Sequence, residues 1–195
     1  GISEDIEAKL TDTIMLCAYY PNEQKVSILS IPRDTFVGNS TTSADSYDKI
    51  NALYQTSPEK TLEAVRNLTG IDVRNYVVIS NNALRDVVDE IGGVYFDVPM
   101  NMNYDDWGQK LHINLKKGYQ LLDGDKAEQL VRFRHNNDGT TYPSEYGTQD
   151  IGRMRTQREF LKAAATQILS GNNIFKIDDI MQVVFENIET NLKME

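Results

Sequence analysis

Short strand-like segments alternate with a helix-like segment in the middle of the chain, and this order most constrains the fold. Residues 76–80 and 94–98 are of strand length and rich in β-branched and aromatic side chains. Residues 82–91 lie between them and carry apolar side chains three and four positions apart, which is the spacing of one helix face. A strand, a helix and a strand in succession favour an α/β fold in which helices pack on a sheet.

The same patterns predict elements on either side of this segment. Apolar runs at 13–19 and 26–31 flank the turn-forming residues 21–25, so a β-hairpin is predicted. Ser57 and Pro58 are typical of a helix start. No repeat or interdomain linker interrupts the patterns, so one domain is expected. The other predictions are helices at 58–69, 123–134, 150–170 and 174–188, a strand at 111–115, and polar loops at 33–48, 100–110 and 136–149.

The composition is that of a globular protein with an acidic balance. Twenty Lys and Arg against 29 Asp and Glu give a formal charge of −9, which disfavours nucleic acid as a partner. Cys17 is the single cysteine, so an intrachain disulfide and a cysteine-based zinc site are excluded. Its apolar neighbours predict a buried, inert thiol. No apolar stretch reaches the length of a membrane span.

Several arginines gather beside polar loops of this acidic chain. Arg132 and Arg134 stand at the end of one predicted helix, and Arg153 stands near the start of the next. Arg33 directly follows a predicted strand. The planar guanidinium group binds phosphate through two parallel hydrogen bonds, so the arrangement favours an anion site. The alternative is that each arginine is solvated or pairs with a nearby carboxylate, and the residues alone leave both readings open.

Other familiar catalytic motifs are absent from the sequence. Gly92 and Gly93 fit neither the dinucleotide-binding fingerprint nor the P-loop, and no nucleophile elbow is present. His112 falls in a predicted strand, and His135 precedes a loop, so the two are poorly placed for a metal cluster. Carboxylates are better candidates. Mg²⁺ binds proteins through one or two carboxylates together with substrate phosphates.

Seven short motifs stand in one order along the chain. They are Thr11–Leu16 (TDTIML), Ser30–Thr35 (SIPRDT), Lys49–Ala52 (KINA), Asp89–Val94 (DEIGGV), Leu122–Ala127 (LDGDKA), Val131–Arg134 (VRFR), and Asp150–Arg153 (DIGR) with Gln157. The ordered combination resembles the LytR-CpsA-Psr family of cell-envelope phosphotransferases from about residue 11 to 192. Each motif alone is a weak signal, but the combination is highly specific.

The resemblance implies a three-layer α/β/α fold with a central mixed β-sheet flanked by helices, in one catalytic-type domain over residues 1–195. It implies a transferase that moves a glycopolymer, of the teichoic acid or capsular polysaccharide type, from a polyprenyl-pyrophosphate carrier to peptidoglycan. Such enzymes work at the extracellular face of the bacterial cell membrane, where an N-terminal helix anchors them. An apolar cavity for the polyprenyl tail is also expected, with Leu53, Val88, Leu130 and Phe160 as candidate lining residues.

The family motifs assign roles to individual residues. Arginines and a metal would neutralise the charge that shifts in phosphoryl transfer, and a carboxylate can take the proton of an acceptor hydroxyl. By motif, Asp12 matches a ligand of the cofactor Mg²⁺. The catalytic positions are matched by Asp150, as the suspected base, and by Arg134. The family's pyrophosphate-binding arginines correspond to Arg33, Arg132, Arg134 and Arg153, and further substrate-binding positions correspond to Lys49 and Gln157.

Two departures from the family pattern are visible. Gly1–Ser3 occupies the place where relatives carry a strand that ends in a second metal carboxylate, and Asp5 is a poor substitute by spacing. Thr156–Arg158 keeps only the first Gln of the family's Arg-Gln-Gln sequence. The chain is therefore expected to be trimmed at both ends, without the membrane anchor and the first strand.

Two other functions compete with the transferase. One is a binding module that holds polyprenyl phosphate or glycan without turnover, which loss of a metal carboxylate would favour. The other is a transcription regulator, suggested only by the family's older label as a transcriptional attenuator. The charge of −9 and the absence of a helix-turn-helix with a basic face speak against it.

Overall fold

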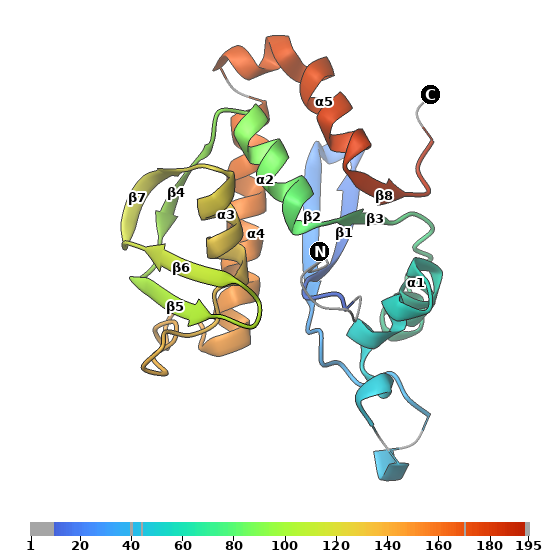
Figure 1. Cartoon of the computed structure of the whole chain (residues 1–195). Helices are drawn as coiled ribbons and strands as arrows, with labels where there is room; N and C mark the ends of the chain where they lie inside the picture. The colour runs from blue at the N-terminus through green and yellow to red at the C-terminus, as the bar shows by residue number, and fades with distance from the viewer. Residues whose placement is uncertain (1–9, 40, 44, 170, 194–195) are drawn as a thin grey trace. The chain divides into compact units, whose positions relative to one another are not determined.

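The structure is a computed structural model that describes residues 10–39, 41–43, 45–169 and 171–193 (Figure 1). Gly1–Ser3 and Asp5, for which the sequence analysis gave expectations, lie outside the described residues. The chain divides into two compact units. Unit 1 comprises residues 1–80 and 189–195, and unit 2 comprises residues 81–188.

The predicted hairpin forms the first part of unit 1. Strands β1 (Ile14–Tyr20) and β2 (Lys25–Ile31) pair antiparallel over seven residues each. The chain reverses through the short helix η1 (Pro21–Glu23) and Gln24, whose φ of 48° lies in the left-handed region. Ile14 and Ile31 pair at the open end of the hairpin, where both are buried in a core with Ile50, Ala64 and Val65.

The prediction of a buried thiol is wrong. Cys17 is exposed, and it is not in a disulfide. Successive side chains of a strand point to opposite faces, and in β1 the buried phase begins at Ile14. Cys17 points to the face opposite that of Ile14. The apolar residues next to Cys17 in the sequence therefore do not indicate that Cys17 itself is buried. Partial burial against its neighbours still raises the pKa of the thiol.

A helix and several short elements complete unit 1. The hydroxyl of Ser57 accepts a hydrogen bond from Lys60 N–H at 3.4 Å at the start of α1 (Pro58–Thr69), and Gly70 ends that helix at a φ of 69°. Both boundaries confirm the sequence prediction. The remaining elements are η2 (Thr41–Ser43), η3 (Ser46–Asp48), η4 (Ile50–Gln55), β3 (Val77–Ile79) and β8 (Ile188–Thr190), of which β3 and β8 pair.

Unit 2 is built from two strand pairs and the helices that cover them. Strand β4 (Val94–Val98) pairs with β7 (Gly118–Leu122), and β5 (Met102–Asp106) pairs with β6 (Leu111–Leu115), both antiparallel. Alternate residues of β4 are buried against α4. The helices, visible in Figure 1, are α2 (Asn81–Glu90), α3 (Gly124–Arg132), α4 (Gln149–Ile168) and α5 (Ile177–Glu186), with η5 (Gly171–Lys176) before α5.

The expected α/β class is confirmed. Within the described residues the strands pair two by two, as β1–β2, β3–β8, β4–β7 and β5–β6. Strands β5 and β6 are joined by only four residues, and so short a turn permits antiparallel pairing alone. Residues 100–110, predicted as a loop, contain β5, and residues 174–188, predicted as one helix, span parts of η5, α5 and β8.

The candidate lining residues of the lipid cavity lie in two different cores. Val88, Leu130 and Phe160 are buried in the core of unit 2, where the rings of Phe96 and Phe160 meet edge to face at 5.6 Å. Leu53 packs against the smaller core of unit 1. Their role in lipid binding stays a prediction.

Candidate functional site

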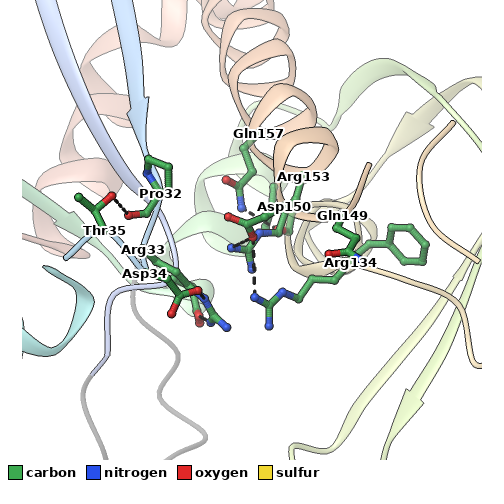
Figure 2. Close-up of polar contacts among 12 residues, drawn as sticks. Pro32, Arg33, Asp34, Thr35, Arg134, Gln149, Asp150, Arg153 and Gln157 are labelled. Carbon is green, nitrogen blue, oxygen red and sulfur yellow. Dashed lines mark hydrogen bonds and ion pairs between the residues drawn. The ribbon is translucent and has the colours of Figure 1, made fainter. Parts of the chain in front are cut away.

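The first turns of α4 carry an arginine–carboxylate cluster. Asp150 and Arg153 are three residues apart and therefore share one helix face. Arg153 Nη2 lies 2.5 Å from Asp150 Oδ1, and Arg134 Nη2 lies 3.7 Å from the same oxygen (Figure 2). The side chain of Arg153 is 4% exposed, whereas those of Asp150 and Arg134 are 33% and 41% exposed. One carboxylate thus lies between a buried and an accessible guanidinium group.

Gln157 lies one turn further along the same face of α4. It is buried, and its side-chain amide donates a hydrogen bond to the carbonyl oxygen of Val131 at 2.8 Å. Val131 belongs to the last turn of α3, so this bond ties α4 to the end of the helix that leads to Arg134. The contact is structural. The substrate-binding role predicted for Gln157 stays a prediction.

Arg132 is held by two neighbours. Its Nη1 lies 2.8 Å from Glu128 Oε1, one helical turn earlier, and its Nη2 donates to Gln109 Oε1 at 3.1 Å. The side chains of Arg132 and Glu128 are each 12% exposed. A nearly buried arginine at a helix end is costly unless it is paired, and Glu128 supplies the partner. The structure therefore supports the pairing alternative for Arg132, and its role toward pyrophosphate stays a prediction.

The loop between α3 and α4 is closed by Thr141, which sequence reasoning missed. Its hydroxyl donates to the carbonyl oxygen of Arg134 at 2.8 Å and accepts a hydrogen bond from Gln149 N–H at 3.0 Å. Gln149 stands next to Asp150 and has a φ of 48°. One hydroxyl thus joins the two ends of the loop, which carry Arg134 and Asp150. A threonine in a polar loop gives no sequence signal of such a contact.

Replacing Thr141 with valine is expected to loosen this closure. The variant leaves the Arg134 carbonyl and the Gln149 amide without their protein partner, at a cost of about 1 kcal/mol in the free energy of unfolding. Amide hydrogen exchange at Gln149 should become about five- to tenfold faster. Thr141→Ser should restore protection, and Thr166→Val, which removes a hydroxyl contact within α4, should leave Gln149 unchanged. Unaltered exchange in Thr141→Val would contradict this assignment.

An aromatic stack supports the loop from within. Tyr142 is 2% exposed, and its ring lies 5.5 Å from the ring of Tyr146 in a stacked arrangement. Arg155 lies over the Tyr146 ring at 4.2 Å. Burial, together with the acceptor Glu159 at 2.9 Å, raises the pKa of Tyr146 to about 12, so its hydroxyl keeps its proton at neutral pH. These rings are packing groups that fix the start of α4.

A second cluster lies in unit 1 after strand β2. Arg33 Nη1 donates to Asp12 Oδ1 at 2.6 Å, and Arg33 Nε lies 3.7 Å from Asp34 Oδ2. Lys49 Nζ binds Asp34 Oδ1 at 2.7 Å. Residues 49–51 lie beside residues 33–35, because Ile50 N–H donates to the Thr35 carbonyl at 2.9 Å. The structure therefore brings together Asp12, Arg33 and Lys49, three of the predicted site residues.

The described residues supply only part of a magnesium site. Asp12 is a carboxylate with 40% of its side chain exposed, and one of its oxygens is bound to Arg33. Across the described part of the chain, no group of three or more His, Cys, Asp or Glu side chains could hold a metal ion. Asp12 therefore fits one ligand position, and the described residues around it do not complete the set.

The two clusters belong to different units. The Asp12–Arg33–Lys49 cluster lies in unit 1, and the Arg134–Asp150–Arg153 cluster lies in unit 2. The motif-based prediction that Arg33 holds the pyrophosphate together with Arg132, Arg134 and Arg153 therefore stays a prediction.

The two histidines lie in unit 2. His112 is an exposed side chain of β6, as predicted, and its Nδ1 contacts Asp105. His135 lies in the loop after α3, where its ring meets that of Tyr104 edge to face at 5.0 Å.

The fold and these clusters describe an α/β protein whose arginines gather around carboxylates. A sequence model of the LytR_cpsA_psr family matches residues 4–195. The chain therefore belongs to the LytR_cpsA_psr family.

Named relatives are similar over most of the chain. The polyisoprenyl-teichoic acid–peptidoglycan teichoic acid transferase TagV of Bacillus subtilis strain 168 is 32% identical over 186 residues, which cover 94% of this chain and 45% of that protein. TagU of the same organism, a transferase of the same description, is 28% identical over 200 residues, covering 100% of this chain and 59% of that protein. The chain spans about half the length of these curated relatives.

A solved structure supports the fold. The crystal structure of B. subtilis TagV superposes with a TM-score of 0.73 at 31% identity, covering 94% of this chain and 67% of that one. Among the helices formed by the described residues, none combines the length and the apolar character needed to span a membrane.

Proposed function

We propose that this chain carries the transferase activity named for its relatives, moving a glycopolymer from a polyprenyl-pyrophosphate carrier to peptidoglycan. The observation that carries the proposal is the cluster in which Asp150 lies between Arg153 and Arg134. Arginine fork geometry suits a pyrophosphate, and Arg134 is accessible enough to meet one. The names of TagV and TagU supply the substrate class.

The proposed reaction is a phosphoryl transfer in which positioning and charge neutralisation supply most of the catalysis. The oxygen of an acceptor hydroxyl on peptidoglycan attacks the phosphorus that carries the polymer. The bond from that phosphorus to the polyprenyl phosphate breaks, and a phosphodiester link forms. Asp150 takes the hydroxyl proton as the candidate base, while Arg134 and Arg153 stabilise charge on the phosphate oxygens.

Mg²⁺ is the proposed cofactor, with Asp12 as its ligand from the described residues. Mg²⁺ usually keeps several waters and binds through one or two carboxylates plus substrate phosphates, so a single exposed carboxylate beside an arginine suits a metal that arrives with the pyrophosphate. When bound, the ion would neutralise part of the charge on the pyrophosphate.

The proposed location is the extracellular face of the bacterial cell membrane, within the cell envelope. The lipid carrier lies in the membrane and the acceptor lies in the wall outside it, so both substrates meet there. An N-terminal membrane anchor would hold the enzyme beside its carrier. Teichoic acid in the names of TagV and TagU supports an envelope polymer as the donor.

A transfer assay tests the proposed function. The protein is incubated with a polyprenyl-pyrophosphate-linked glycopolymer labelled in its sugars, with Mg²⁺ and with peptidoglycan strands. We expect label in the strands and release of polyprenyl phosphate. Binding of the carrier without any transfer would instead indicate a non-catalytic binding module. The absence of both binding and transfer would reject the transferase and the binding module together.

Arginine replacements test the anion site. Arg134→Ala should weaken the binding of a short polyprenyl pyrophosphate by about 1.5–3 kcal/mol, because a charge-assisted hydrogen bond is lost. Arg33→Ala, which removes the guanidinium group of the cluster in unit 1, should weaken it similarly. Arg74→Ala removes the same charge from an exposed arginine that pairs with Asp72, so it controls for net charge and should leave affinity unchanged. Calorimetric titration measures all three, and unchanged affinity in Arg134→Ala would contradict the site.

Magnesium titration tests the cofactor without measuring activity. We expect no tight binding of Mg²⁺ alone, because one carboxylate gives the hydrated ion little reason to release its waters. Calorimetry with the short polyprenyl pyrophosphate present should show Mg²⁺ binding, which Asp12→Ala should abolish. Asp5→Ala is the matched carboxylate control. Equal loss in Asp5→Ala would show that Asp5 is a ligand, and strong binding in Asp12→Ala would remove Asp12 from the site.

A further inference from the structure

A single tryptophan stands at the tip of the β5–β6 turn. Trp107 is 90% exposed, and it is the only tryptophan of the chain. Tryptophan is among the most buried side chains on average, because its large apolar surface gains most from leaving water. An indole held almost entirely in solvent contributes little to this fold. Its position therefore points to a contact outside the chain.

The turn that carries Trp107 is closed by hydrogen bonds. The carboxylate of Asp106 accepts a hydrogen bond from Gln109 N–H at 3.0 Å and another from the Gln109 side-chain amide at 2.8 Å. These hydrogen bonds hold the pKa of Asp106 below its usual value. Lys110 closes the turn at a φ of 49°, with its N–H 3.4 Å from the carbonyl oxygen of Trp107. These hydrogen bonds restrict the backbone that carries the indole, and such restriction reduces the entropy lost when a ligand binds.

The same turn is joined to Arg132, an arginine that the family motifs predict to hold pyrophosphate. Gln109 Oε1 accepts a hydrogen bond from Arg132 Nη2 at 3.1 Å. Trp107 therefore lies two residues from a direct contact of Arg132. A pyrophosphate bound at Arg132 would therefore lie close to this turn.

We propose that Trp107 is a sugar-stacking residue, which packs on the face of a pyranose ring of the glycopolymer substrate or of the acceptor glycan. This inference rests on the proposed function. The C–H groups on one face of a pyranose ring are apolar and slightly positive, and they complement the negative face of an aromatic ring. The ring hydroxyls need acceptors at the rim. Asp105 and Asp106 precede the indole directly, and their carboxylate oxygens keep further lone pairs beside the hydrogen bonds that they accept from Asn137 and Gln109.

The charge around Trp107 favours a sugar over a lipid surface. Exposed tryptophans also enter membrane interfaces, but anionic lipids attract segments rich in lysine and arginine. Here two carboxylates precede Trp107, and Lys110 is the single basic residue of the turn. Neutral hydroxylated rings tolerate such a neighbourhood, whereas an anionic surface is repelled by it.

Fluorescence of the single tryptophan tests the proposal directly. Acrylamide quenching of Trp107 is measured in the whole chain with four probes: N-acetylglucosamine carried on a short isoprenyl pyrophosphate, a peptidoglycan tetrasaccharide, inorganic pyrophosphate, and phosphatidylglycerol vesicles. We expect the quenching constant to fall at least twofold with one of the sugar probes and to stay unchanged with pyrophosphate. Protection by the first sugar probe identifies the donor glycan, and protection by the tetrasaccharide identifies the acceptor.

Two variants separate stacking from general effects. Trp107→Ala should weaken binding of the protecting sugar probe about five- to tenfold by calorimetry, and Trp107→Phe should retain most of the affinity. Phe175→Ala removes another aromatic side chain, 88% exposed in η5, and should change nothing. Protection by neither sugar, equal protection by pyrophosphate, or protection only by phosphatidylglycerol vesicles would overturn the proposal. These readouts need no turnover, so a failed transfer assay would leave them interpretable.

Discussion

Replacing Asp150 with asparagine is expected to lower the rate of polymer transfer about 10²- to 10⁴-fold while strengthening the binding of pyrophosphate. Asparagine keeps the shape of the side chain but cannot take up the hydroxyl proton, and a general base contributes about that factor. Removing the carboxylate also removes a negative charge lying 2.5 Å from Arg153 and 3.7 Å from Arg134. Both guanidinium groups then meet the ligand without an internal competitor.

The opposite signs of these two effects make the test specific. Calorimetry measures affinity for a short polyprenyl pyrophosphate, and the transfer assay measures rate. A purely structural role of Asp150 would lower both. Unfolding in urea supplies the control, because Arg153 is nearly buried and loses its counter-ion. The free energy of unfolding should fall by about 1–3 kcal/mol, less than the cost for a fully buried pair because Asp150 is a third exposed. An unchanged transfer rate would exclude Asp150 as the base.

Local signals explain which elements the sequence could predict. Ser57, Pro58 and Gly70 bound α1 through contacts within a few residues, so its ends were predictable. Strand β5 was not. Its outward side chains Asn103 and Asp105 are polar, and its backbone bonds to Asn136 and Asn137 of a loop more than thirty residues away. Side-chain partners at that separation leave no periodic trace in the sequence.

The candidate site divides in the same way. Ordered motifs identified Arg134, Asp150 and Arg153, and the structure places these three side chains together. The sequence did not predict the roles of Thr141 and Gln109, because a loop hydroxyl and a turn amide gain their contacts only from partners that folding brings near. Where chemistry is carried by charge on a helix face, a sequence can predict it. Contacts that position those charges require the structure.

The glycine of the Asp150–Arg153 motif has a packing reason that leads to a second prediction. A Cβ atom on Gly152 would lie 2.2 Å from the carbonyl oxygen of Gly147 and 2.4 Å from Cγ of Tyr142. Neither can move easily. Tyr142 is buried between Phe133, whose ring it meets edge to face at 5.4 Å, and Tyr146, on which it stacks. At Gly152, α4 therefore approaches the preceding loop so closely that only glycine fits.

Gly152→Ala is accordingly expected to destabilise unit 2 by about 3 kcal/mol or more, at the upper end of the cost of overpacking a core. For a chain of this size that corresponds to a fall of about 6–12 °C in Tm. Gly108→Ala is the matched control, because its Cβ would meet only the Asp106 side chain at 3.3 Å in an exposed turn, and it should change stability by less than about 0.5 kcal/mol. Circular dichroism during thermal and urea unfolding measures both variants. Equal unfolding midpoints for Gly152→Ala and Gly108→Ala would show that Tyr142 and the loop shift to accommodate a methyl group. Close packing of α4 would then not be the reason for glycine at position 152.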